Sequence, residues 1–70
     1  MGEKIKISLA AARVNAKLTQ REAAEKAHIS NKTLNNWENG RVDIPFAALE
    51  TLSHIYGMPK EYIFTPTKST

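Results

Sequence analysis

Two helix-start signals limit most strongly what this chain can fold into. Thr19 is followed three residues later by Glu22, the spacing of a capping box, in which each side chain accepts a hydrogen bond from the other residue's backbone amide. Ser30 is a good N-cap for a second helix. Gly40 suits the left-handed position that ends a helix. The segment 19–39 therefore predicts two short helices joined by a three-residue turn.

Helical patterns also occur on both sides of this unit. An alanine-rich stretch precedes it, and apolar residues at helical spacing follow it, with Pro45 acceptable in the first turn of their helix. No stretch favours a strand. We therefore expect an all-α fold, a compact five-helix bundle in which residues 1–64 form one domain and 65–70 a flexible tail. The helices are predicted at about 5–17, 20–27, 31–39, 45–56 and 59–64.

The size and composition of the chain narrow its possible functions. Seventy residues without a cysteine offer neither disulfides nor thiolate metal ligands, and no apolar run is long enough to span a membrane. His28 and His54 lack the neighbours that metal binding or acid–base chemistry needs. Phosphate-binding loops and nucleophile motifs are also missing. We expect a cytoplasmic protein that is not an enzyme, with no catalytic residue, metal or cofactor.

The charge is unevenly distributed. The formal net charge is +3, but residues 1–41 carry eight basic against four acidic side chains, whereas residues 42–70 carry two against three. A basic half favours a polyanionic partner, although a solvated surface with chance asymmetry explains the charge equally well.

The predicted helix 31–39 has a polar outer face. Leu34 and Trp37 mark its buried side, which for Trp37 makes core packing a better interpretation than base stacking, and Lys32 and Asn36 then point away from the core. Asparagine can pair bidentately with adenine, and lysine can donate to guanine. Because asparagine is a poor helix former, a short helix with four of them is easier to explain as a DNA-reading surface. The predicted base-contacting residues are Ser30, Asn31, Lys32, Thr33, Asn35 and Asn36.

Several segments together resemble the phage repressor and Cro type of helix-turn-helix, also called the XRE family, over about residues 5–64. The resemblance implies a five-helix DNA-binding domain, usually a dimer on a two-fold operator. Two features depart from the family: His28 stands where glycine is frequent, and Ala23 and Ala27 replace larger aliphatic residues. The segments that carry the resemblance are Ala12-Arg13, Leu18 to Ser30, Leu34, Trp37 to Arg41, Ile44 to Phe46, Leu49, Leu52, Tyr56 to Pro59 and Tyr62-Ile63.

The resemblance also implies roles for residues around the second and third helices. Arg13 and Glu38 resemble a pair that links the first helix to the end of the third. Gln20 matches a residue that touches the DNA backbone, and the free amides of a helix start suit a phosphate. The predicted phosphate contacts are Thr19, Gln20, Asn39 and Arg41.

Apolar crowding near the C-terminus predicts a dimer surface. Met58, Tyr62 and Phe64 lie in a segment too short to bury them all, although Tyr62 and Ile63 could instead close the core. The favoured function is sequence-specific binding of double-stranded DNA at a near-palindromic operator, by a homodimeric transcriptional regulator for which repression is preferred. The alternative is a protein-interaction module or antitoxin that uses the same fold.

Overall fold

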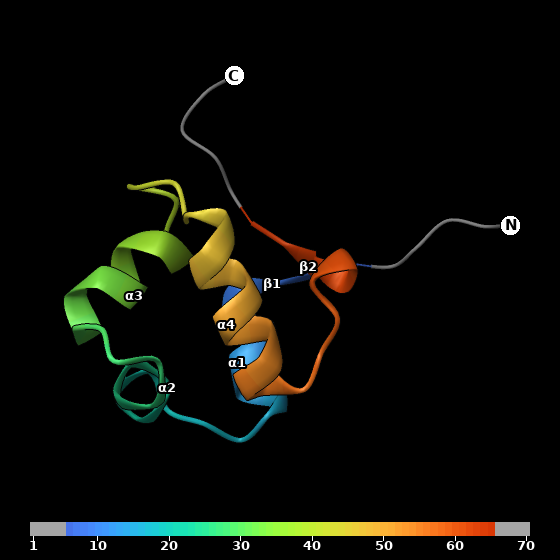
Figure 1. Cartoon of the computed structure of the whole chain (residues 1–70), viewed down its shortest axis with the longest axis horizontal. Helices are drawn as coiled ribbons and strands as arrows, with labels where there is room; N and C mark the ends of the chain where they lie inside the picture. The colour runs from blue at the N-terminus through green and yellow to red at the C-terminus, as the bar shows by residue number, and fades with distance from the viewer. Residues whose placement is uncertain (1–5, 66–70) are drawn as a thin grey trace, which may run out of the picture.

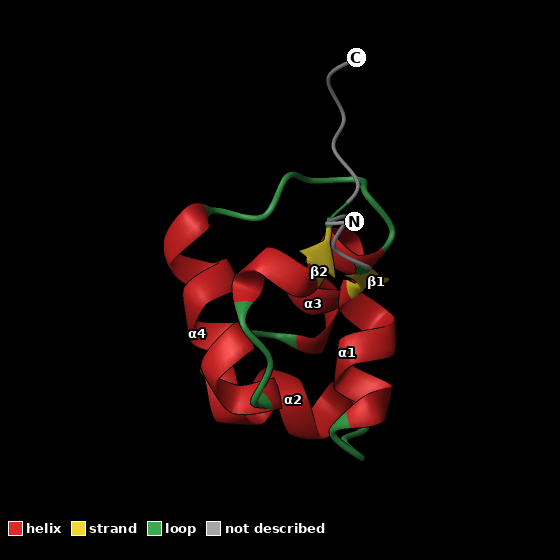
Figure 2. Ribbon diagram, turned by 90° about the vertical axis from the view of Figure 1, so that its right-hand side faces the viewer, coloured by secondary structure: helices red, strands yellow, loops and turns green. Residues whose placement is uncertain are grey.

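A computed structural model describes residues 6–65 of the chain. In this range, four α-helices pack around one core, and two short strands lie side by side near the chain ends (Figures 1 and 2). α2 packs against both α3 and α4, while α1 contacts α4 and β2. In chain order the elements are β1 (Ile7–Ser8), α1 (Leu9–Asn15), α2 (Gln20–Ala27), α3 (Asn31–Glu38), α4 (Phe46–Tyr56), the 3₁₀ helix η1 (Lys60–Tyr62) and β2 (Ile63–Phe64).

The described chain is mostly helical, as predicted, but the prediction of a fifth helix over 59–64 was wrong, and a small strand pair accompanies the four helices. Only one turn of 3₁₀ helix, η1, forms after Pro59, and Ile63 and Phe64 are the strand β2. β2 pairs in parallel with β1, with Ile63 opposite Ile7. Strand geometry turns successive side chains to opposite faces, so Ile63 is buried whereas Phe64 is 54% exposed. Because β2 has only two residues and pairs with a strand near the other end of the chain, the sequence around it shows no strand periodicity.

The first helix is also shorter than the predicted range of about 5–17. Ser8 caps it by accepting a hydrogen bond from the Ala11 amide, so the helix begins at Leu9. It ends at Asn15, and Lys17 takes a left-handed backbone conformation with φ of 64°. The fourth helix likewise begins at Phe46, which makes Pro45 its N-cap rather than a residue of its first turn.

The helix-turn-helix forms as predicted, with α3 ending one residue earlier than expected. Both hydrogen bonds of the capping box between Thr19 and Glu22 are present. His28 ends α2 with φ of 60°, a left-handed conformation that suits the glycine frequent at this position in the family. Ser30 caps α3 by accepting from the Thr33 amide.

The core lies where α1, α2, α3 and α4 meet. Leu9, Leu34 and Leu52 are fully buried, and Ala23 lets α2 approach its neighbours closely. Trp37 is 8% exposed, so its prediction as a core residue is confirmed. The remaining buried hydrophobic residues of the described chain are Ala12, Ala24, Tyr56 and Ile63.

The structure does not describe residues 66–70, so most of the predicted tail lies outside the described residues. Between residues 6 and 65, no helix combines the length and apolar character needed to cross a bilayer.

Candidate nucleic-acid interface

The outer face of α3 carries the side chains predicted to contact bases. Asn31 and Lys32 are exposed, and Asn35 and Asn36 are half-buried. The inner face of α3 is fixed by Leu34 and by Trp37, which pack into the core. This arrangement holds the helix against the domain and leaves a row of amide and ammonium groups on its outer side.

The structure brings Arg13 and Glu38 together. Arg13 Nε donates to Glu38 Oε2 at 2.8 Å, and Arg13 Nη2 donates to Oε1 at 3.3 Å. The two side chains are only 14% and 6% exposed. Arg13 Nη1 also donates to the carbonyl of Leu18, between α1 and α2. The pair therefore joins α1, the start of the helix-turn-helix and the end of α3.

Gln20 links this ion pair to the outer face of α3, which sequence reasoning did not anticipate. Gln20 Nε2 donates to Glu38 Oε1 at 2.9 Å. At the same time, Gln20 Oε1 accepts a hydrogen bond from Asn31 Nδ2 at 3.0 Å. A chain of hydrogen bonds thus runs from Arg13 through Glu38 and Gln20 to Asn31. No local pattern in the sequence marks it, because its members come from three different helices.

A second group of polar side chains lies at the C-terminal end of α3. Asn39 Nδ2 donates to the Asn35 carbonyl at 2.9 Å and also to Asn35 Oδ1. Arg41 Nη1 lies 3.4 Å from the same Oδ1. The structure therefore brings together one predicted base contact, Asn35, and two predicted phosphate contacts, Asn39 and Arg41.

Two of the predicted DNA-contacting residues, Thr19 and Ser30, cap the starts of helices. Ser30 Oγ accepts from the Thr33 amide and donates to Thr33 Oγ1 at 2.8 Å. Thr19 Oγ1 accepts from the Glu22 amide at 3.0 Å. Their positions at the starts of α2 and α3 are thus explained by local folding, whether or not they also touch DNA.

The predicted dimer residues follow α4, near the C-terminal end of the described chain. Met58 is half-buried and packs against the core, whereas Tyr62 is 40% and Phe64 54% exposed. Phe46 at the start of α4, which was not predicted, is 64% exposed. Lys60 Nζ lies over the Phe46 ring, 5.5 Å from its centre, so the lysine covers part of this exposed ring.

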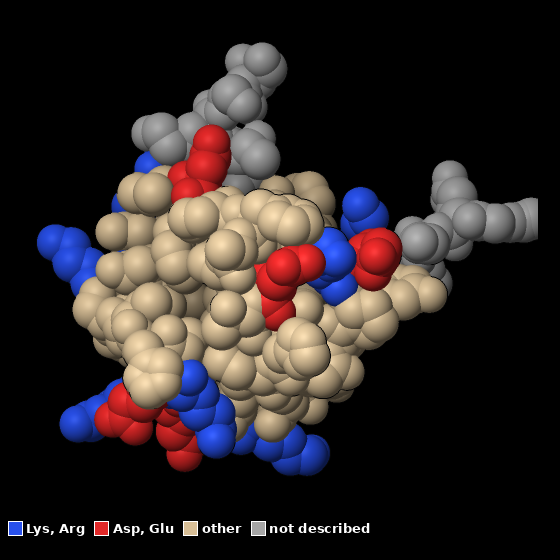
Figure 3. Space-filling view, viewed as in Figure 1, with Lys and Arg blue, Asp and Glu red and all other residues tan. Residues whose placement is uncertain are grey.

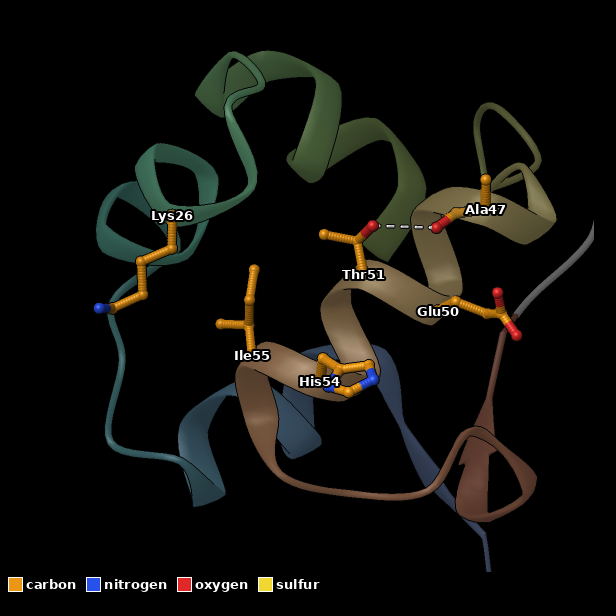
Figure 4. Close-up of a pocket in the computed structure, with 6 residues that line it drawn as sticks. All are labelled: Lys26, Ala47, Glu50, Thr51, His54 and Ile55. Carbon is orange, nitrogen blue, oxygen red and sulfur yellow. Dashed lines mark hydrogen bonds between the residues drawn. The ribbon is translucent and has the colours of Figure 1, made fainter.

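Charged side chains of both signs surround a mostly uncharged face (Figure 3). A shallow hollow lies between α2 and α4 (Figure 4). Thr51 and Ile55 extend into it, with Lys26 on the α2 side, while the Thr51 hydroxyl donates to the Ala47 carbonyl at 3.1 Å. Within residues 6–65 no three potential metal-ligating side chains come together. None of the hollow's residues is among the predicted DNA contacts.

Comparison with known families gives the class of the protein. A helix-turn-helix family matches residues 9–63, which covers the whole unit described above. The chain belongs to this XRE-type helix-turn-helix family, whose domains are DNA-binding and regulatory. No curated protein and no solved structure matches the chain.

Proposed function

We propose that this chain is a sequence-specific transcriptional regulator that binds double-stranded DNA with α3 in the major groove. The observation that carries the proposal is the outer face of α3, where polar side chains stand opposite the buried Leu34 and Trp37. A helix of this kind fits the major groove, in which each base pair presents a distinct pattern of donors and acceptors.

The hydrogen bond from Asn31 to Gln20 supports a reading role for Asn31. An amide side chain has two N–H donors and a carbonyl oxygen. Gln20 accepts from the Asn31 amide nitrogen, which leaves the second N–H and the oxygen for a base. Those two groups are the pair that recognises adenine. Gln20 would therefore fix the orientation of Asn31 without using the atoms needed for recognition.

The remaining side chains of α3 are assigned by what their atoms already do. Lys32 is exposed and can donate to guanine, and Asn36 can pair as Asn31 does. The side-chain oxygen of Asn35, Oδ1, accepts from Asn39 and lies near Arg41. We therefore assign Asn35 mainly to positioning these two residues. Ser30 and Thr33 remain candidates for secondary base contacts.

The proposed phosphate contacts flank α3. Because the first N–H groups of a helix lack intrahelical partners, the Gln20 amide at the start of α2 can donate to a phosphate. The Thr19 amide already donates to Glu22 Oε1, so Thr19 would contact a phosphate through the proton of its hydroxyl. Asn39 and Arg41 follow α3 and would meet the backbone at its other end. These contacts fix the position of the domain on DNA and carry no sequence information.

We further propose that two copies bind a near-palindromic operator. A two-fold pair presents two α3 helices to successive major grooves, about 34 Å apart. Tyr62 and Phe64 supply the exposed apolar groups for the contact, and the half-buried Met58 is its third proposed residue. Repression is the simplest outcome, because occupancy of a promoter site is sufficient for it. The same function agrees with the cytoplasmic location predicted from the sequence.

Selection from a pool of randomised DNA duplexes tests the proposal. The chain is incubated with the pool, bound duplexes are recovered and sequenced, and the cycle is repeated. We expect enrichment of one sequence with approximate two-fold symmetry. Recovery of duplexes without a shared sequence would contradict the proposal, and enrichment of a single unrepeated half-site would contradict the dimer.

A further inference from the structure

Tyr56, the last residue of α4, has a buried hydroxyl that no described group accounts for. The residue is 7% exposed, and its hydroxyl oxygen is the only buried side-chain nitrogen or oxygen in residues 6–65 that has no hydrogen-bond partner. Buried polar groups nearly always have partners, because desolvating one without compensation costs free energy. The hydroxyl therefore calls for an explanation.

The charged groups that act on this hydroxyl are Arg13 and Glu38, which form the ion pair described above. The pKa of Tyr56 is raised to about 12, mainly by burial and also by the Glu38 carboxylate, whereas the Arg13 guanidinium acts in the opposite direction. The hydroxyl thus keeps its proton across the physiological pH range. It is therefore a permanent hydrogen-bond donor that lies within the electrostatic influence of the Glu38 carboxylate.

The Glu38 carboxylate has room for one more donor. Its Oε1 accepts from Gln20 and from Arg13 Nη2, whereas its Oε2 accepts from Arg13 Nε. A carboxylate offers about four acceptor sites. Because the Glu38 side chain is only 6% exposed, bulk water has little access to the remaining site. The unpaired donor is thus within electrostatic range of an acceptor with spare capacity.

We propose that the Tyr56 hydroxyl donates to the Glu38 carboxylate through one buried water, and so acts as a positioning residue for DNA reading. A buried water of this kind is common where polar groups are left unpaired in a protein interior. The bond adds the end of α4 to the chain of hydrogen bonds that runs from Glu38 through Gln20 to Asn31. The positioning role rests on the proposed function, but the bond itself does not.

Unfolding of the Tyr56→Phe variant by urea tests the bond without DNA. If the hydroxyl donates to Glu38, its removal strands an acceptor and raises the unfolding equilibrium constant by about fivefold. If the hydroxyl is unpaired, its removal leaves this constant unchanged or lowers it, which would overturn the proposal. Thr51→Val is the control, because it removes an exposed hydroxyl whose acceptor, the Ala47 carbonyl, lies where water can replace the lost bond. We expect a change of less than twofold for the control.

A double-mutant cycle on DNA tests the positioning role. Affinity for the duplex selected by the wild-type chain is measured for Tyr56→Phe, Asn31→Ala and the double variant. We expect Tyr56→Phe to weaken binding about fivefold when Asn31 is present and less than twofold when it is absent. Equal losses in both backgrounds would show that Tyr56 supports the fold alone. If no sequence is selected at all, the proposed function and this role fail together, while the unfolding experiment still decides the bond.

Discussion

At the scale of single residues, the Glu38 side chain joins three helices. Its carboxylate accepts from Arg13 in α1 and from Gln20 in α2, while Glu38 itself ends α3. Through Gln20 it reaches Asn31 on the outer face. The residues that hold the helices together and the residues proposed to read DNA are thus parts of one hydrogen-bonded group.

Replacement of Asn36 by alanine tests direct readout at one position. We expect a loss of about 1–3 kcal/mol on the selected duplex and relaxed preference at one base pair, because a bidentate contact is removed. Fluorescence anisotropy with duplexes varied at each position measures both effects. Asn15→Ala at the end of α1 is the matched control and should bind like the wild type. A loss that is equal on selected and scrambled duplexes would remove Asn36 from the reading set.

Replacement of Arg41 by alanine tests a phosphate contact. The affinity should fall on every duplex sequence, because the contact is to the backbone. The slope of log K against log salt concentration should become shallower by about one unit, since one fewer counterion is released. A titration series over salt concentration measures the slope. An unchanged slope would show that Arg41 makes no such contact.

Some single-residue features could be predicted from the sequence and others could not. The left-handed conformation of His28 follows from its place after α2, and the burial of Trp37 follows from its spacing with Leu34. The bond between Gln20 and Glu38 spans 18 residues and depends on how two helices cross. No residue pattern encodes that crossing, so Gln20 was assigned to phosphate alone.

At the scale of elements, the ion pair between Arg13 and Glu38 holds α1 to the helix-turn-helix. We expect Arg13→Met and Glu38→Gln each to lower the free energy of unfolding by about 3 kcal/mol. Each substitution leaves the charge of the remaining partner buried without an opposite charge beside it. The double variant should lose less than the sum of the two. Urea unfolding of all four proteins gives the coupling energy, and a value of zero would contradict the role.

The chain contains a matched comparison for this cycle. Arg21 and Glu25 form an ion pair on the outer surface of α2, with N–O distance 4.0 Å and side chains 85% and 73% exposed. The same pair of substitutions there should show a coupling of only about 0.3–0.5 kcal/mol. The contrast separates the effect of burial from the effect of opposite charge.

The elements differ in how far local sequence determines them. α2 and α3 carry their own start signals in Thr19 and Ser30, and both helices begin where those signals predict. β2 has no such signal, because a two-residue strand exists only through its pairing with β1. In that pairing Ile63 lies opposite Ile7, which is 56 residues earlier in the chain. Local propensity could therefore find the helix-turn-helix and miss the strand pair.

At the scale of the whole molecule, the proposed dimer depends on the apolar surface near β2. Phe64→Ala should reduce two-copy binding to a palindromic duplex, because it removes a large exposed apolar group from the contact. Sedimentation analysis with and without the duplex counts the bound copies. Val14→Ala is the control, since Val14 is similarly exposed but lies on α1. Two-copy binding that survives Phe64→Ala unchanged would place the interface elsewhere.

The measurement that tests the central claim most directly is the ratio of affinities for the selected and a scrambled duplex. It is compared between the wild type and a variant with Asn31, Lys32 and Asn36 all replaced by alanine, the best helix former, which preserves α3. We predict a ratio of about 10³ or more for the wild type and close to one for the variant, with binding to the scrambled duplex largely retained. A variant that keeps the wild-type ratio would show that α3 does not read the DNA.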